Sequence, residues 1–266
     1  MDVNAYLERI GAHRPDRPDA EALRDLHERH LRSVPFENLS IHLGEPIDLA
    51  ESALAEKIIQ RRRGGFCYEL NGLFAVLLRE LGFEVSLLSA KVARPDGSLG
   101  PPFDHMALRV ELDEPWLADV GFGKHSLRPL RLTAAEPQPD PYGEFLVVDT
   151  PEGDLEVRRD GVVAYVAERR QRALSDFAPT AWWQATSPVS PFRKGTTCSM
   201  PSGDGRVTIA GGLLIETGAD GDRAETALET DDAILAAYRE RFGMTLEHVP
   251  DLLTRTREPS TVGTGQ

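Results

Sequence analysis

RRRGGFCYELNGLF, residues 61–74, places one of the two cysteines of the chain between a pair of glycines and an apolar helix. From Glu69 onwards, apolar residues recur at i+1, i+4, i+5, i+8, i+9 and i+12, and Gly82 follows where a C-terminal cap is expected. Cys67 therefore lies at the N-terminal edge of a helix. There the helix dipole and unpaired backbone N–H groups favour a thiolate over a thiol, which makes Cys67 a candidate nucleophile.

The two glycines before the thiol, Gly64 and Gly65, allow a substrate to approach the backbone closely. The backbone N–H groups near Cys67 and Tyr68 are then placed to stabilise a developing oxyanion. The alternative is that Cys67 is a small buried hydrophobe at the start of a core helix, since free cysteines are among the most buried residues. A base and an orienting group elsewhere in the chain would decide between the two.

Composition limits what the protein binds. The 266 residues are 41% hydrophobic, and 43 acidic against 30 basic side chains give a formal net charge of −13. This charge opposes binding to nucleic acid or to an anionic membrane except through a local basic patch.

We expect a cytoplasmic protein, because no signal-like segment and no run of ~18 apolar residues is found. Two cysteines without CxxC spacing predict free thiols and no zinc site.

Three regions differ in their hydrophobic period. Residues 1–83 have helical spacing, as in LRDLHERHL and LAEKIIQR. Residues 84–190 alternate with period two between turns, as in VSLLSAKV, HMALRVEL and WLADVGFG, which predicts an antiparallel sheet or small barrel. Residues 191–266 contain a hairpin, RVTIAGG with LLIET, and the helix DDAILAAYRERF. We expect the tail REPSTVGTGQ to be disordered, since it has nothing to bury.

The strand region supplies a base and an orienting group. His105 begins the strand HMALRVEL, and Asp119 interrupts the apolar run WLADVGFG, where an unpaired carboxylate is costly. A three-residue loop, 112–114, sets a register that makes His105 and Asp119 diagonal neighbours on one face, whereas a two-residue loop would separate them. Cys67, His105 and Asp119 in this order form the general arrangement for covalent thiol catalysis.

With these residues identified, the chain resembles the arylamine N-acetyltransferase family from about residue 5 to 250. The resemblance rests on YLERIG, SVPFENLSI, RRGGFCYELNGLF, DHMALRV and DVGFG, in the order and spacing of that family. It implies an α+β fold with three parts: a helical bundle carrying the nucleophile (1–83), an antiparallel β-barrel carrying the histidine and aspartate (84–190), and a small α/β lid (191–266).

The resemblance also implies the site residues. The triad of the family matches Cys67, His105 and Asp119. Supporting residues are Glu37, Arg63 and Asn71, and the implied substrate or coenzyme A contacts are Phe36, Gly65, Phe66, Phe122, Gly123 and Lys124. The implied reaction is ping-pong transfer of an acyl group from acetyl-coenzyme A, as co-substrate, to an arylamine, hydrazine or N-hydroxyarylamine through a Cys67 thioester. Neither a permanently bound cofactor nor a metal is expected.

The identity of the substrates stays open at this point. Lys124 after DVGFG and the Trp pair in TAWWQATSPVSPF depart from the family pattern. A branch of the family, the amide synthases that release and cyclise ansamycin-type polyketides, uses the same chemistry with a polyketide synthase carrier domain as partner. A transglutaminase-like or papain-like hydrolase and a non-catalytic binding module are alternatives from other classes. The partners expected otherwise are a small-molecule amine and an acyl thioester, not nucleic acid or a membrane.

Overall fold

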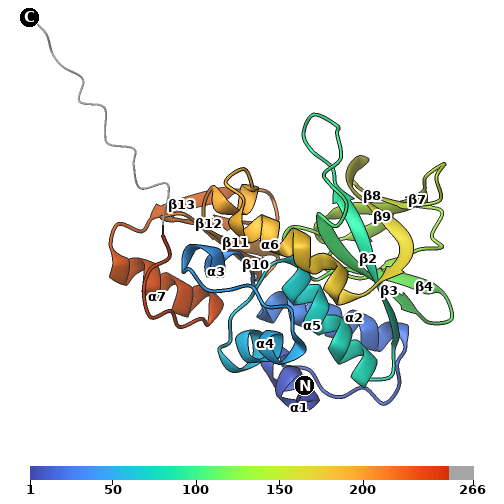
Figure 1. The fold of residues 1–266 in the computed structure, drawn as a ribbon, viewed down its shortest axis with the longest axis horizontal. Coiled ribbons are helices and arrows are strands. Elements are labelled where there is room, and N and C mark those ends of the chain that lie inside the picture. The colour runs from blue at the N-terminus through green and yellow to red at the C-terminus, as the bar shows by residue number, and fades with distance from the viewer. Residues whose placement is uncertain (252–266) are drawn as a thin grey trace, which may run out of the picture.

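The computed structural model describes residues 1–251, so the predicted disordered tail REPSTVGTGQ lies outside the described residues. Helices from the N-terminal third pack beneath a large curved sheet, and a second, smaller sheet with one long helix lies beside them (Figure 1). The architecture is mixed α+β with a nearly closed, barrel-like sheet, as the sequence predicts.

The N-terminal region is helical, as its hydrophobic period predicts. Its elements are α1 (Val3–Ile10), α2 (Ala20–Ser33), α3 (Leu39–His42), α4 (Glu51–Ala55), the π-helical turn η1 (Glu56–Gln60) and α5 (Cys67–Glu80). Helix α5 begins at Cys67 rather than at Glu69, because the Glu69 side chain accepts a hydrogen bond from the backbone N–H of Phe66 at 3.1 Å and so caps the first turn. The nucleophile candidate is therefore the first residue of the helix.

The larger sheet has eight strands in the order β5-β4-β3-β2-β9-β8-β7-β6. Each pair of neighbouring strands in this order is antiparallel. The strands are β2 (Glu84–Val92), β3 (His105–Glu111), β4 (Pro115–Ala118), β5 (Leu130–Arg131), β6 (Gln138–Asp140), β7 (Gly143–Asp149), β8 (Leu155–Arg159) and β9 (Val162–Arg172). The two edge strands approach each other, since the Gln138 side chain bonds both the N–H and the C=O of Arg131.

The loop between β3 and β4 has the expected three residues, 112–114. Glu111 pairs with Pro115, and the ladder continues to Leu108 and Ala118. The strand ends there, although the apolar pattern predicts that it runs to Gly123. The next backbone N–H groups, those of residues 119–121, donate to side chains instead of to a neighbouring strand. Asp119 therefore sits just beyond the sheet.

The smaller sheet is built mainly from the C-terminal third. Its order is β1-β10-β11-β12-β13, from β1 (Phe36–Glu37), β10 (Thr197–Ser202), β11 (Gly205–Ala210), β12 (Leu213–Thr217) and β13 (Arg223–Ala227). The predicted hairpin forms β11 and β12, and the predicted helix is α7 (Asp231–Phe242), whose Tyr238 and Phe242 pack on the sheet. Strand β1 comes from the helical region, so the proposed domain division at residue 83 is crossed by one strand pair.

A connecting segment joins the two sheets. It contains η2 (Leu174–Phe177), α6 (Ala178–Thr186) and η3 (Pro191–Arg193). The sequence pattern does not predict α6, which contains the Trp pair. Among residues 1–251, no helix has the length and apolar character needed to cross a membrane.

Burial of His30 in α2 predicts acid sensitivity. Its ring is fully buried and hydrogen-bonds the Tyr6 hydroxyl at 2.9 Å, and burial, with the nearby charges of His27 and Arg9, lowers the pKa of His30 well below its ordinary value. As the pH falls, His30 is therefore protonated in the unfolded state before it is protonated in the folded state. The free energy of unfolding then decreases below about pH 6.5, by up to about 1.4 kcal/mol per pH unit.

We expect His30→Phe to remove this dependence. Urea denaturation of the wild type at pH 7.5, 6.5 and 5.5 should show a free energy of unfolding that falls faster with acid than that of the variant. The matched control is His13→Phe, which changes an exposed histidine and should keep the wild-type slope. Equal slopes in the wild type and in His30→Phe would contradict the prediction.

Candidate active site

Cys67 and His105 line one pocket, with a volume of about 180 Å³, and Asp119 lies directly behind it. The elements that build the pocket come from all parts of the chain: β1, the first turn of α5, β2, β3, the segment after β4, and α6 with η3. The lining residues are Phe36, Cys67, Val92, Asp104, His105, Gly121, Phe122, Gln184, Pro191 and Phe192. Most of this lining is apolar.

His105 and Asp119 form the closest polar contact of the pocket wall. Nε2 of His105 lies 2.7 Å from Oδ2 of Asp119, and the two side chains are 3% and 1% exposed. Burial alone would lower the pKa of His105, but the negative charge and hydrogen bond of Asp119, with a hydrogen bond to Cys67, raise it to about 10. The imidazole therefore holds a proton readily while it faces the thiol.

The other carboxylate oxygen of Asp119 is also satisfied. Oδ1 accepts from Nδ2 of Asn71 at 2.9 Å and from the backbone N–H of Gly121 at 3.0 Å. Burial by itself raises the pKa of Asp119, but the charge and hydrogen bond of His105 and the hydrogen bond from Asn71 bring it below its ordinary value. Asp119 is thus held as a carboxylate without a Lys or Arg partner within 4 Å among residues 1–251.

Asn71 fixes the segment that carries Asp119. Its Nδ2 also donates to the carbonyl of Met106 at 2.6 Å, and its Oδ1 accepts from the N–H of Val120 at 2.9 Å. One helical turn after Cys67, Asn71 therefore ties α5 to both the strand of His105 and the segment of Asp119.

A second positioning side chain, His27, is missed by sequence reasoning. Its Nε2 accepts from the backbone N–H of Asp119 at 3.1 Å, and its Nδ1 lies 3.0 Å from the carbonyl of Leu127. Burial lowers the pKa of His27, so the neutral ring with the proton on Nδ1 satisfies both contacts. The only sequence signal is a polar residue on the apolar face of α2.

Gly121 brings the aspartate segment against the nucleophile helix. A Cβ atom at this position would lie 2.7 Å from Cα of Cys67 and 2.7 Å from Nδ2 of Asn71. Neither backbone nor amide can give way cheaply, so the close approach requires glycine. This packing explains why the first glycine of the motif DVGFG, Gly121, is required.

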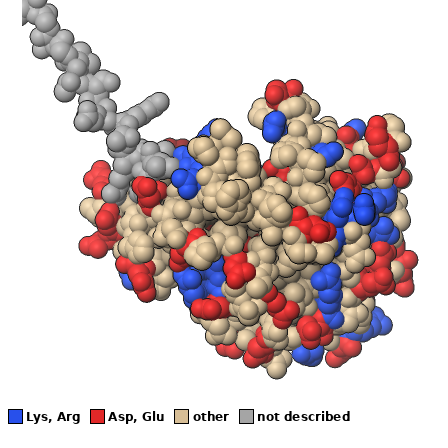
Figure 2. All heavy atoms as spheres, viewed as in Figure 1, with Lys and Arg blue, Asp and Glu red and all other residues tan. Residues whose placement is uncertain are grey.

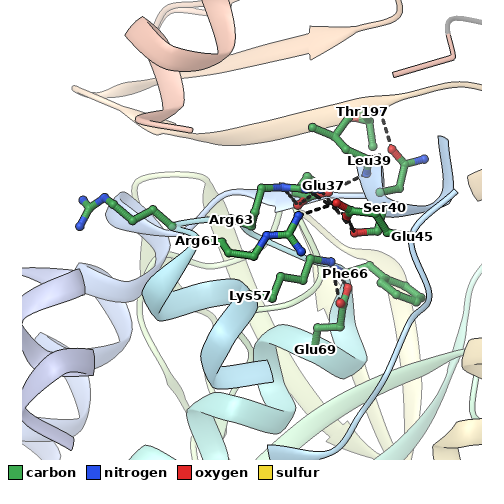
Figure 3. Close-up of polar contacts among 12 residues, drawn as sticks. Glu37, Leu39, Ser40, Glu45, Lys57, Arg61, Arg63, Phe66, Glu69 and Thr197 are labelled. Carbon is green, nitrogen blue, oxygen red and sulfur yellow. Dashed lines mark hydrogen bonds and ion pairs between the residues drawn. The ribbon is translucent and has the colours of Figure 1, made fainter. Parts of the chain in front are cut away.

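A buried network of charges lies beside the first turn of α5 (Figure 3). The Arg63 guanidinium, 2% exposed, bonds Oε1 of Glu37 through Nη2 at 2.9 Å and Oε2 of Glu45 through Nη1 at 3.1 Å. The other oxygen of Glu37 accepts from the N–H of Leu39 at 2.6 Å. Burial raises the pKa of Glu37, but the charges of Arg63 and Lys57 and the Leu39 hydrogen bond bring it below its ordinary value.

A further ion pair in Figure 3 holds the turn that carries Cys67. Nζ of Lys57 lies 2.6 Å from Oε1 of Glu69, and the other Glu69 oxygen accepts from the N–H of Phe66. A Cβ at Gly65 would lie 2.6 Å from that oxygen, so Gly65 leaves room for the Glu69 carboxylate. Lys57 and Glu69 are absent from the residues selected on sequence.

The residues that the family resemblance implies for contact with substrate or coenzyme A do not all line one pocket. Phe36 and Phe122 line the pocket, and the Phe122 ring meets His105 edge to face at 5.0 Å. Gly65 and Phe66 do not line it; Phe66 is completely buried and packs against Phe192, which does.

Lys124 lines a neighbouring cavity of about 320 Å³ between the two sheets, and Gly123 directly precedes it in the chain. Lys124, Arg159 and Arg206 are the basic residues of its lining. Arg206 is tied to the carbonyl of Gly123 at 2.8 Å. In the sequence, only Gly123 separates Lys124 from Phe122, which lines the pocket that holds Cys67.

Comparison with known proteins identifies the family. Residues 19–250 match the family model described as N-acetyltransferase. This chain belongs to that family. An arylamine N-acetyltransferase of Mycolicibacterium smegmatis is 37% identical over 261 residues, covering 92% of this chain and 93% of the relative.

Solved structures of the family superimpose closely. The arylamine N-acetyltransferase of Salmonella typhimurium has a TM-score of 0.84 at 34% identity and covers 91% of this chain and 90% of its own. That of Mycobacterium marinum in complex with CoA has a TM-score of 0.83 at 32% identity, covering 91% and 93%. These relatives carry the name arylamine N-acetyltransferase, so neither the amide-synthase alternative nor its carrier-domain partner gains support.

The Glu37–Arg63 pair predicts a large stability effect. Arg63→Met leaves a buried carboxylate without its main counter-charge, which should lower the free energy of unfolding by about 3–5 kcal/mol, measured by urea denaturation. The control is Arg61→Met, which removes a 47% exposed partner of the same Glu45 carboxylate and should cost about 1 kcal/mol or less. Similar losses in the two variants would contradict the prediction.

Proposed function

We propose that this protein transfers the acetyl group of acetyl-coenzyme A to an arylamine, hydrazine or N-hydroxyarylamine through a thioester on Cys67. The observation that carries the proposal is the buried His105–Asp119 hydrogen bond beside a thiol at the first position of a helix. Membership of the N-acetyltransferase family, and a relative solved in complex with CoA, support coenzyme A as the carrier of the donor.

In the first half-reaction, the thiolate of Cys67 attacks the carbonyl carbon of the donor thioester. His105 holds the proton taken from the thiol, and Asp119 stabilises the resulting imidazolium. The oxyanion forms near the first turn of α5, whose N–H groups at Cys67 and Tyr68 have no acceptor inside the helix. Collapse of this intermediate expels coenzyme A as a thiol, which takes up the proton from His105, and leaves an acetyl thioester on Cys67.

In the second half-reaction, the amine attacks the acetyl-enzyme. His105 accepts a proton from the attacking nitrogen, and the Cys67 thiolate leaves as the amide forms. Phe36 and Phe122 offer flat apolar surfaces to an aromatic acceptor in a pocket of about 180 Å³. Exclusion of water by this apolar lining favours the amine over hydrolysis.

The cavity beside Lys124 is suited to the phosphates of the donor. On the face shown in Figure 2, Lys and Arg are interspersed with Asp and Glu, so an anionic ligand needs a local group of cations. Lys124, Arg159 and Arg206 line one cavity together, next to Gly123. We assign Gly123 and Lys124 to donor binding on this basis, with Glu37, Arg63 and Asn71 as supports of the triad.

Intact mass spectrometry after brief incubation with acetyl-coenzyme A, without an amine, tests the proposal. The wild type should gain one acetyl group, and Cys67→Ala should gain none. Cys198→Ala is the matched control, because it removes the other free thiol, which is completely buried, and it should still be acetylated. Absence of the adduct from the wild type would contradict the proposal, and an adduct that disappears equally fast with and without amine would indicate a hydrolase.

Lys124→Gln tests the donor assignment. We expect the KM for acetyl-coenzyme A to rise about five-fold, as befits a partly solvated charge contact worth about 1 kcal/mol. The KM for an acetyl thioester of a short thiol without phosphates should not change. Equal effects on both donors would show that Lys124 does not bind phosphate.

A further inference from the structure

Asp104 is the only acidic residue among those that line the Cys67 pocket. It precedes His105, and its side chain is partly buried. No Lys, Arg or His among residues 1–251 lies within 4 Å to form an ion pair with it. A carboxylate without an ion-pair partner in a mostly apolar pocket carries a desolvation cost, which an incoming ligand can offset.

Two buried side chains hold this carboxylate in place. The hydroxyl of Ser190 donates to Oε1 of Gln184 at 2.7 Å, which fixes the amide so that its Nε2 donates to Oδ1 of Asp104 at 2.9 Å. Ser190 and Gln184 are 0% and 2% exposed. A Cβ at Gly100 would lie 2.1 Å from Oδ2 of Asp104, so glycine leaves room for the second oxygen. The orientation of the carboxylate is therefore built into the pocket.

The carboxylate keeps capacity for another donor. An ionised carboxylate accepts at about four positions, and the side chain of Gln184 and the backbone N–H of Val92 occupy two of them. Burial raises the pKa of Asp104 above its ordinary value, and the charges of His105 and Arg94 with the hydrogen bonds from Val92 and Gln184 limit that rise. A ligand in the pocket thus meets a directed negative charge next to the reacting thiol.

We propose that Asp104 selects the acyl acceptor, favouring aromatic amines that carry a second N–H donor or a cationic group and rejecting those that carry a carboxylate. The proposal rests on the proposed function, because the acceptor must enter the pocket of the acetyl-enzyme. An N–H donor satisfies the free positions of the Asp104 carboxylate, whereas a carboxylate on the acceptor would face a like charge in a pocket that water screens poorly.

The alternative is that Asp104 only ties β3 to α6 through Gln184. Asp104→Asn separates the two roles, since asparagine has the same shape and keeps an oxygen for the Gln184 amide but has no charge. A purely structural role would leave acceptor preference unchanged in this variant.

The experiment compares 1,4-diaminobenzene with 4-aminobenzoate, using acetyl-coenzyme A as donor and the ratio of their kcat/KM values as the readout. Comparing this ratio between the variant and the wild type cancels changes in the first half-reaction and the difference in intrinsic reactivity between the two amines. We expect the preference for the diamine to fall about ten-fold in Asp104→Asn, relative to the wild type. Asp113→Asn, which removes an exposed charge in the β3–β4 loop, is the matched control and should keep the wild-type ratio.

Each outcome decides the matter. An unchanged ratio in Asp104→Asn, with normal acetylation of Cys67 by mass, overturns the selection role and leaves the proposed function intact. Failure of the wild type to form an acetyl-enzyme overturns both. If Asp104→Asn does not fold, Asp104→Ser removes the charge while retaining a hydroxyl near Gln184, and it should give the same ten-fold fall in the ratio.

Discussion

The buried contact between His105 and Asp119 is the constraint on which the rest of the structure depends. A carboxylate that is 1% exposed is tolerated only if its charge is balanced and its oxygens are satisfied. Here His105 takes one oxygen, and Asn71 and the N–H of Gly121 share the other. The backbone of Asp119 is itself anchored to His27. Four separate segments must therefore be in place before the imidazole is oriented.

The same constraint explains how helices and sheet are combined. Asn71 and Cys67 lie one turn apart on α5, so the helix that presents the thiol also orients the aspartate. The turn at the start of α5 is held from below by Lys57 and Glu69. Beside it, the buried pair of Glu37 and Arg63 lies where β1 leaves the helical region to join the smaller sheet. Hydrogen bonds of Asn71 thus link the helix of Cys67 to the larger sheet, and the Glu37–Arg63 pair lies where the helical region meets the smaller one.

Local patterns predict the parts of this structure that local chemistry determines. The period of α5 and the alternation in β3 place Cys67 and His105 correctly at the starts of their elements, and the three-residue loop sets the register that brings the chain to Asp119. The prediction extends β4 too far, because an apolar run cannot show that side chains of distant residues will bind its backbone N–H groups. The two-residue strand β1 is missed for a similar reason, since its pairing with β10 joins residues some 160 positions apart in the sequence.

Local sequence patterns likewise do not predict which residues surround the pocket. Gln184 and Phe192 become neighbours of Cys67 only through the packing of α6 and η3 over the barrel, whereas Asp104 reaches the pocket because it directly precedes His105 and β3. Likewise, the role of His27 follows from a contact between residues 27 and 119. Family resemblance implies Cys67, His105 and Asp119 as the triad, but the residues that hold and surround them are apparent only from the three-dimensional arrangement.

The most direct test of the account is the ¹⁵N NMR spectrum of the His105 ring, assigned by difference from a His105→Gln sample. Because Asp119 raises the pKa of His105, both ring nitrogens should be protonated at pH 7.5 in the resting enzyme, and Asp119→Asn should convert the ring to its neutral form. A neutral His105 in the wild type at that pH would contradict the central claim that the buried carboxylate maintains a protonated imidazole beside the thiol.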